Sequence, residues 1–138
     1  MNDQLPSHLN QLTPGAATLG REFLGFDADG TTASIRFQAR AEFANRHGSV
    51  LGGFLAAMLD SATGLTLLAG LPPELTAVTT HLDTEFVKPA PIGTLLVKAR
   101  VTSRRDRDAV VEAEILDTEG NSCARAVAKL RIVRRALI

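Results

Sequence analysis

The 138-residue sequence contains no tryptophan, no tyrosine and only one cysteine, Cys123. A single cysteine cannot form an internal disulfide, and no cysteine–histidine cluster has the spacing of a metal site, so we expect a reduced, cytoplasmic protein without a metal. Fifteen basic residues balance fifteen acidic ones, and zero net charge gives no field that would attract nucleic acid. A glycine-rich phosphate loop of the nucleotide-binding type is also absent.

Length and composition predict one globular domain over residues 1–138, with 45% apolar and 22% charged residues. The N-terminal residues 1–15 have no apolar core of signal-peptide length, and we expect a short helix or a loose tail there. The sequence shows no internal repeat and no linker that would divide the domain.

The segment 50–69 has no polar stripe at any spacing, and Asp60 is its only charged residue. A helix that is apolar on all sides is expected to be buried on all sides. A buried carboxylate is costly unless it is paired or used in chemistry, so Asp60 is the first catalytic candidate. The alternative is a structural Asp that bonds to the hydroxyl of Ser61 or Thr63.

The segment is about long enough to cross a bilayer, but Asp60 and the lack of flanking aromatic residues argue against a membrane helix.

Six strands are predicted, at residues 18–26, 32–39, 76–88, 94–103, 109–117 and 122–133. The last three alternate apolar and polar residues and are joined by polar turns, which is typical of antiparallel hairpins with one buried face. The helix is expected to end near residue 69, because Gly70 and two prolines follow. We therefore predict an α+β fold in which a curved sheet of about six strands wraps around one central helix. The uncovered side of that helix is left for another subunit, which predicts a homodimer or a dimer of dimers.

The order of these elements and two motifs resemble the hot-dog fold, and within it the phenylacetate-degradation (PaaI-like) type of acyl-CoA thioesterase. The resemblance covers nearly the whole chain after about residue 16. The second motif is FVKPAPIG at residues 86–93, and the first is N-x6-G-G-x6-D, carried by Asn45, Gly52, Gly53 and Asp60. The resemblance implies an acyl-CoA substrate, no cofactor apart from the CoA of that substrate, and active sites at a dimer interface.

Thioester hydrolysis needs hydrogen-bond donors for the developing oxyanion and a carboxylate or base. Gly52 and Gly53 are expected at the helix start, where N–H groups are unpaired, the helix dipole is positive and a carbonyl can come close. Asp60 would be the general base or the nucleophile. One helix separates Gly52 from Asp60 by about 12 Å, whereas reacting atoms must approach to about 3 to 3.5 Å. We therefore expect Asp60 of one subunit to act with Gly52 of the other.

The remaining candidates are less specific. The resemblance gives Asn45 a contact with the thioester carbonyl and Thr79 a place near the attacking water, while a loop-capping Asn and an exposed strand Thr are the alternatives. Cationic side chains for the CoA phosphates are expected at a strand end and at a hairpin tip, with ordinary solvated turns as the alternative. These residues are Lys88, Arg104, Arg105 and Arg107.

Two positions depart from the family pattern. Family members usually have a histidine directly before the glycine pair, where this chain has Leu51, and His47 lies four residues upstream. His81 replaces the usual Asp on the strand after the helix. We place Leu51 and His81 with Gly53 among the substrate-binding residues, with an exposed strand histidine as the alternative for His81. The missing histidine makes a non-catalytic acyl- or CoA-binding hot-dog protein the alternative function, and a hot-dog dehydratase or hydratase has little support. The identity of the acyl group is not predicted.

Overall fold

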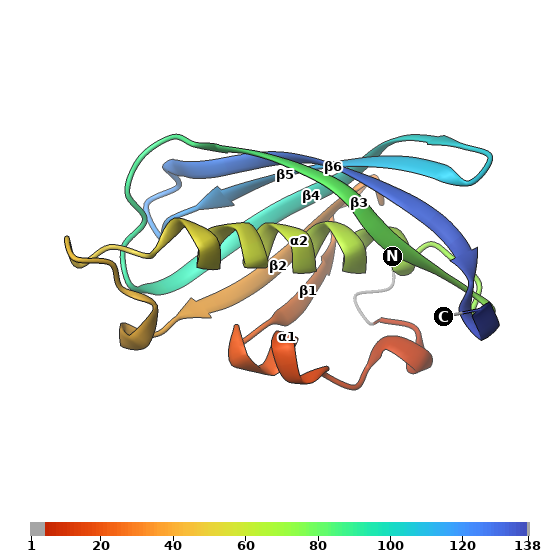
Figure 1. The fold of residues 1–138 in the computed structure, drawn as a ribbon, viewed down its shortest axis with the longest axis horizontal. Coiled ribbons are helices and arrows are strands. Elements are labelled where there is room, and N and C mark those ends of the chain that lie inside the picture. The colour runs from red at the N-terminus through yellow and green to blue at the C-terminus, as the bar shows by residue number, and fades with distance from the viewer. Residues whose placement is uncertain (1–4, 138) are drawn as a thin grey trace.

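In the computed structural model, which describes residues 5–137, six antiparallel strands form one sheet that wraps around a long helix (Figure 1). The helices are α1 at Pro14–Thr18 and α2 at Gly52–Leu68, and 3-10 turns lie at Ser7–Leu9, Ala41–Phe43 and Arg135–Leu137. The strands are β1 at Glu22–Phe26, β2 at Thr32–Ala39, β3 at Leu75–Phe86, β4 at Gly93–Arg105, β5 at Asp108–Leu116 and β6 at Ser122–Arg134. The predicted fold class is confirmed.

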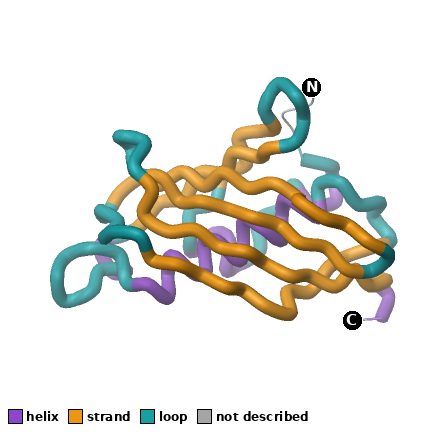
Figure 2. The backbone as a smooth tube through the Cα atoms, turned by 90° about the horizontal axis from the view of Figure 1, so that it is seen from above, coloured by secondary structure: helices purple, strands orange, loops and turns teal. Residues whose placement is uncertain are grey.

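The strand order across the sheet is β1-β2-β4-β5-β6-β3. Strands β4, β5 and β6 pair as consecutive hairpins, as their polar turns predict. The chain then places β3, which follows α2 directly, at the edge of the sheet opposite β1. Helix α2 therefore has to cross the concave face of the sheet, and Figure 2 shows it running along that face. No helix within residues 5–137 combines the length and the hydrophobicity that a membrane crossing needs.

Small residues line the sheet where the helix packs. Ala33, Ala99, Ala113 and Ala126 are cross-strand neighbours in one row over β2, β4, β5 and β6, and all four are buried. Without large side chains in this row, the sheet and α2 can approach closely. The facing side of the helix contributes Leu55, Met58, Leu59, Ala62 and Leu65 to the core.

The strand predicted from residue 18 begins later, at Glu22. Residues 14–18 form α1 instead, because Thr13 caps this helix by accepting a hydrogen bond from the Ala16 N–H at 3.3 Å, and Pro14 occupies the first turn. Within the predicted N-terminal segment 1–15, the structure has the 3-10 turn at Ser7–Leu9 and the start of α1. Residues 1–4 of that segment lie outside the described residues.

The sheet covers only one side of α2, so the single chain has the open side that we predicted for another subunit, and burial on all sides stays a prediction for the assembly. Asp60 and Gly53 are exposed, and Ala57 and Gly64 are only partly covered. These four positions follow the spacing of one helical face, and the sheet covers the opposite face. The face lacks a polar stripe because glycine and alanine occupy it, and the sequence pattern therefore looks like that of a buried helix. Asp60 is an exposed carboxylate in the single chain.

Candidate active site

Helix α2 begins at the glycine pair without a side-chain cap. Its N-cap residue is Leu51, whose side chain has no atom that accepts a hydrogen bond. Among the described residues, the N–H groups of Gly52 and Gly53 have no partner, whereas those of Phe54 and Leu55 bond to the Leu51 carbonyl at 2.9 and 3.3 Å. Two free N–H groups at the positive end of a 17-residue helix are suited to a carbonyl oxygen that becomes negative during reaction.

The flanking chain holds this helix start in place. The Leu51 N–H donates to the Phe43 carbonyl at 2.8 Å, and the Val50 N–H donates to the Ala90 carbonyl at 2.9 Å. Phe43 is buried and stacks on Phe54 of the first helical turn, with ring centroids 4.1 Å apart. The free N–H groups are thus presented by a fixed frame, which is the condition for effective stabilisation of an oxyanion.

Asn45 uses its side chain inside the loop that precedes the helix. Its Oδ1 accepts hydrogen bonds from the N–H groups of His47 at 2.9 Å and Ser49 at 3.2 Å, and its Nδ2 donates to the Ser49 hydroxyl at 3.1 Å. This is the loop-capping role. One hydrogen of the Asn45 amide is left for another acceptor, so the predicted contact with a thioester carbonyl stays a prediction.

The carboxylate of Asp60 makes no hydrogen bond and no ion pair with any described residue. The hydroxyl of Thr63 donates to the backbone carbonyls of Leu59 at 2.8 Å and Asp60 at 3.1 Å, and the hydroxyl of Ser61 accepts from Arg21 at 3.0 Å. Neither hydroxyl is therefore the partner that a structural role for the Asp60 carboxylate would need. Asp60 presents both carboxylate oxygens on the open face of α2.

A one-residue β-bulge between Thr79 and His81 decides where these two side chains point. Thr79 is opposite the buried Leu130, so it lies on the helix side of the sheet. His81 is opposite Lys129 and lies on the outer face, where its Nδ1 is 3.1 Å from the Thr80 hydroxyl. The structure separates the two candidates: Thr79 shares a side of the sheet with α2, and His81 does not.

The predicted cationic residues lie at opposite ends of α2. Lys88 follows β3 near the helix start, and its ammonium group pairs with Asp117 at 3.1 Å. Arg104 and Arg105 lie at the end of β4, and Arg104 lines a small pocket at the other end of the helix, beside Gly70. The helix is about 25 Å long, so one chain does not bring Lys88 together with the two arginines.

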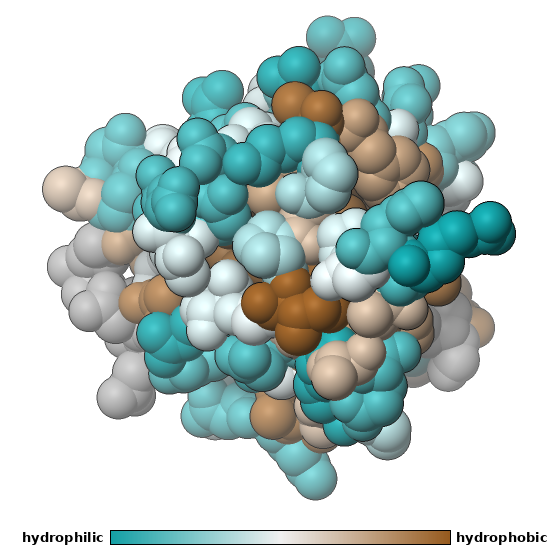
Figure 3. Space-filling model, turned by 90° about the vertical axis from the view of Figure 1, so that its left-hand side faces the viewer, coloured by the Kyte–Doolittle hydropathy of each residue, from teal (hydrophilic) through white to brown (hydrophobic). Residues whose placement is uncertain are grey.

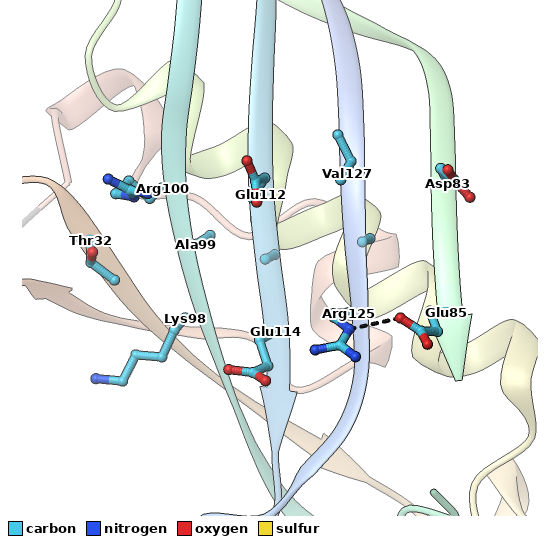
Figure 4. Close-up of a pocket in the computed structure, with 12 residues that line it drawn as sticks. Thr32, Asp83, Glu85, Lys98, Ala99, Arg100, Glu112, Glu114, Arg125 and Val127 are labelled. Atoms are coloured by element: carbon cyan, nitrogen blue, oxygen red, sulfur yellow. Dashed lines mark hydrogen bonds and ion pairs between the residues drawn. The ribbon is translucent and has the colours of Figure 1, made fainter. Parts of the chain in front are cut away.

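A groove on the outer face of the sheet is not the predicted site. Its walls carry Lys98 and Arg100 on β4, Glu112 and Glu114 on β5, and Arg125 on β6, so the sign of charge alternates from strand to strand (Figure 4). The Arg125 Nε donates to Glu85 Oε1 at 2.8 Å. In this view α2 lies behind the sheet, which separates the groove from Gly52 and Asp60.

Phe86, the last residue of β3, lies against the helix start, and sequence reasoning gave it no role. Its ring carbons Cε1 and Cζ are 3.3 Å from the point where a Cβ on Gly52 would lie. Phe86 is nevertheless 55% exposed, and Leu51, which directly precedes Gly52, is 48% exposed. Figure 3, which views this end of the molecule, shows apolar residues gathered among hydrophilic ones. The phenylalanine of the FVKPAPIG motif is visible in the sequence, but its contact with Gly52 depends on the bulge in β3.

Residues 47–124, which contain the glycine pair, Asp60 and strand β3, match the thioesterase superfamily. A protein of Saccharolobus solfataricus, provisionally named an esterase, is 28% identical over 102 residues, which are 74% of this chain and 72% of that protein. A solved structure from Ralstonia eutropha JMP134, a phenylacetic acid degradation-related protein provisionally described as a thioesterase, has a TM-score of 0.82 and 30% identity over 90% of this chain and 94% of that one. The BH2602 protein of Bacillus halodurans, solved with CoA, has a TM-score of 0.78 and 24% identity over 91% and 80% of the two chains.

The chain therefore belongs to the thioesterase superfamily, because the match spans more than half of its residues. It is a thioester hydrolase with the hot-dog fold, of the PaaI-like type that its glycine and FVKPAPIG motifs resemble.

The Lys88–Asp117 pair gives a prediction for the pH dependence of stability. Hydrogen bonds from the N–H of Asn121 at 2.9 Å, and from Lys88 and the N–H of Glu119, keep the pKa of Asp117 below its usual value. The folded-state pKa is lower than the unfolded one, so this carboxylate stabilises the fold above about pH 4, and the contribution is lost as the pH falls through the folded-state pKa. Asp117→Asn should therefore lower the free energy of unfolding at neutral pH.

Urea unfolding of the parent and of Asp117→Asn between about pH 7 and about pH 2 tests this expectation. The difference between their free energies of unfolding should become smaller as the pH falls. Glu119→Gln is the matched control, because the Glu119 carboxylate lies in the same turn and has no such partners. If the difference in free energy of unfolding stayed constant or increased in acid, the Asp117 carboxylate would not be the stabilising group.

Proposed function

We propose that this thioester hydrolase cleaves acyl-CoA to the free acid and CoA, with the N–H of Gly52 polarising the carbonyl and Asp60 of a second subunit activating the attack. The observation that carries the proposal is that α2 has two groups without a partner among the described residues. They are the N–H groups at its uncapped start and the carboxylate of Asp60. These are the two groups that thioester hydrolysis needs.

In this reaction the thioester carbonyl oxygen accepts a hydrogen bond from the Gly52 N–H, and negative charge develops on that oxygen as a water oxygen adds to the carbonyl carbon. Asp60 takes a proton from that water. The bond between carbon and sulfur then breaks, and the proton passes to the departing sulfur, which leaves as the CoA thiol. In the alternative route, Asp60 itself attacks the carbonyl carbon, the bond between carbon and sulfur breaks, and the CoA thiolate leaves and takes a proton from water. Water then hydrolyses the resulting mixed anhydride, which releases the acid and restores the Asp60 carboxylate. Both routes need the carboxylate.

The use of two subunits follows from distance. Gly52 and Asp60 are on one continuous helix, about 12 Å apart along its axis. Antiparallel packing of two such helices brings Asp60 of each to Gly52 of the other. The open face of α2 supports this arrangement, because Gly53, Ala57 and Gly64 are small enough to let another chain come close.

CoA as the thiol component is supported by the Bacillus halodurans relative, which was solved with CoA. The basic residues Arg104 and Arg105 are exposed at the far end of α2. In an antiparallel dimer this end lies near the helix start of the other subunit. The two arginines are the proposed contacts for the CoA phosphates, with Lys88 contributing if it leaves Asp117.

Asp60→Asn should lower kcat for acyl-CoA hydrolysis by about 100-fold or more, because the amide cannot act as a base or nucleophile. The fold should be unaffected, since the Asp60 side chain has no partner in the single chain. Release of CoA thiol measures the rate, and circular dichroism checks the fold. Asp83→Asn, an exposed carboxylate on the outer face of β3, is the control and should keep the parent rate. Parent-like turnover by Asp60→Asn would end the proposal.

Leu51→His tests whether the missing imidazole matters. In the proposed mechanism the Gly52 N–H and Asp60 suffice, so we expect this variant to change the rate only modestly and His47→Ala to matter little. Thiol release from the two variants and the parent is the measurement. An inactive parent with a large gain in Leu51→His would instead identify an acyl-CoA-binding relative without chemistry, and a large loss in His47→Ala would place the functional imidazole in the loop.

A further inference from the structure

The two glycines at the start of α2 have different surroundings. A Cβ on Gly52 would lie 3.3 Å from two ring carbons of Phe86, whereas a Cβ on Gly53 would meet nothing within 4 Å. Neither residue has a positive φ, so backbone conformation does not require glycine at either position. Gly52 is therefore the residue that lets the Phe86 ring pack directly on the helix start.

The position of Phe86 is fixed by its backbone. Phe86 is opposite the buried Ala124, which puts its ring on the helix side of the sheet. The N–H groups of Val87 and Lys88 both donate to the Cys123 carbonyl, at 2.8 and 3.2 Å, and anchor the chain immediately after the strand. The bulge at Thr80 sets this direction, because a strand without it would point residue 86 to the outer face.

The backbone fixes the position of Phe86, but the rest of the described chain leaves this residue exposed to solvent. Phe86 is the one exposed residue among the six phenylalanines, and the other five are buried or partly buried. Phe86 lies against Gly52 and the exposed Leu51 precedes Gly52 in the chain, so exposed apolar residues adjoin the free N–H of Gly52. A hydrocarbon or aryl group gains by covering such residues, while the amides and phosphates of CoA do not.

We infer that Phe86 is a specificity-determining residue: its ring is the wall against which the acyl group packs when the thioester carbonyl is bound at Gly52. The inference rests on the proposed function, since it takes the Gly52 N–H as the carbonyl-binding group. The ring touches Gly52, so a carbonyl held there places the first carbons of the acyl chain beside the ring. The contribution of Phe86 should grow with the apolar size of the acyl group.

The experiment compares kcat/KM for acetyl-CoA and hexanoyl-CoA in the parent and in Phe86→Ala. We expect Phe86→Ala to lower the hexanoyl-CoA value by about tenfold or more and the acetyl-CoA value by less than about threefold. Phe86→Tyr keeps the ring and should keep the parent ratio. Val78→Ala truncates an exposed apolar side chain on the outer face of the same strand and is the matched control. Equal losses on both substrates, or no loss on either, would overturn the inference.

A binding measurement separates this inference from the proposed function. Thioether analogues of acetyl-CoA and hexanoyl-CoA are not hydrolysed, and calorimetry gives their Kd and that of CoA itself. Phe86→Ala should weaken the hexanoyl analogue by about tenfold and leave CoA unchanged. If the parent hydrolysed no acyl-CoA, the proposed function would fail while this comparison still decided the role of Phe86. Equal affinity of parent and Phe86→Ala for the hexanoyl analogue would contradict that role.

Discussion

The structure depends on one packing constraint: a 17-residue helix without a polar stripe lies against a sheet that covers only one of its sides. The row of alanines across β2, β4, β5 and β6 allows the close contact on the covered side. On the other side, small residues and Asp60 are left open. In the proposed dimer this open face packs on another copy of the chain, and Asp60 lies in the interface.

Helix α2 supplies both chemical groups of the proposed site, the N–H groups at its start and the Asp60 carboxylate. Neither group bonds to another described residue of the chain. A helix start normally satisfies its first N–H groups with a Ser, Thr, Asp or Asn cap, but here Leu51 stands at that position. Asp60 likewise lacks a partner, because Thr63 bonds to backbone carbonyls and Ser61 to Arg21. Both places are open to solvent, so these groups are free to contact a substrate and a second subunit, as the proposed function requires.

Local patterns in the sequence were sufficient for the hairpins β4 to β6 and for the extent of α2, because alternation and helix-stop residues are local signals. The contacts between segments far apart in the sequence could not be predicted from local patterns, and the positions of His81, Phe86 and Lys88 depend on such contacts. The bulge in β3 turns His81 to the outer face and Phe86 toward Gly52. The Lys88–Asp117 ion pair joins two loops far apart in sequence. Asp60 was expected to be buried because an apolar segment without a polar stripe does not show which of its residues face the sheet, and Asp60 lies on the side that does not.

The central claim, that each active site combines Gly52 of one subunit with Asp60 of the other, is tested most directly by mixing two inactive variants. Asp60→Asn removes the carboxylate. Gly52→Pro removes the N–H at the first helical position, and Leu51, with φ −58° and ψ 135°, has the conformation that a following proline requires. The Phe86 ring of the same subunit must shift to admit the proline carbons, which leaves the other subunit's Gly52 site intact. After joint unfolding and refolding, about half of the dimers are mixed and each holds one complete site, so the account predicts about a quarter of the parent thioesterase activity. A mixture that forms dimers but stays as inactive as its components would contradict the shared site.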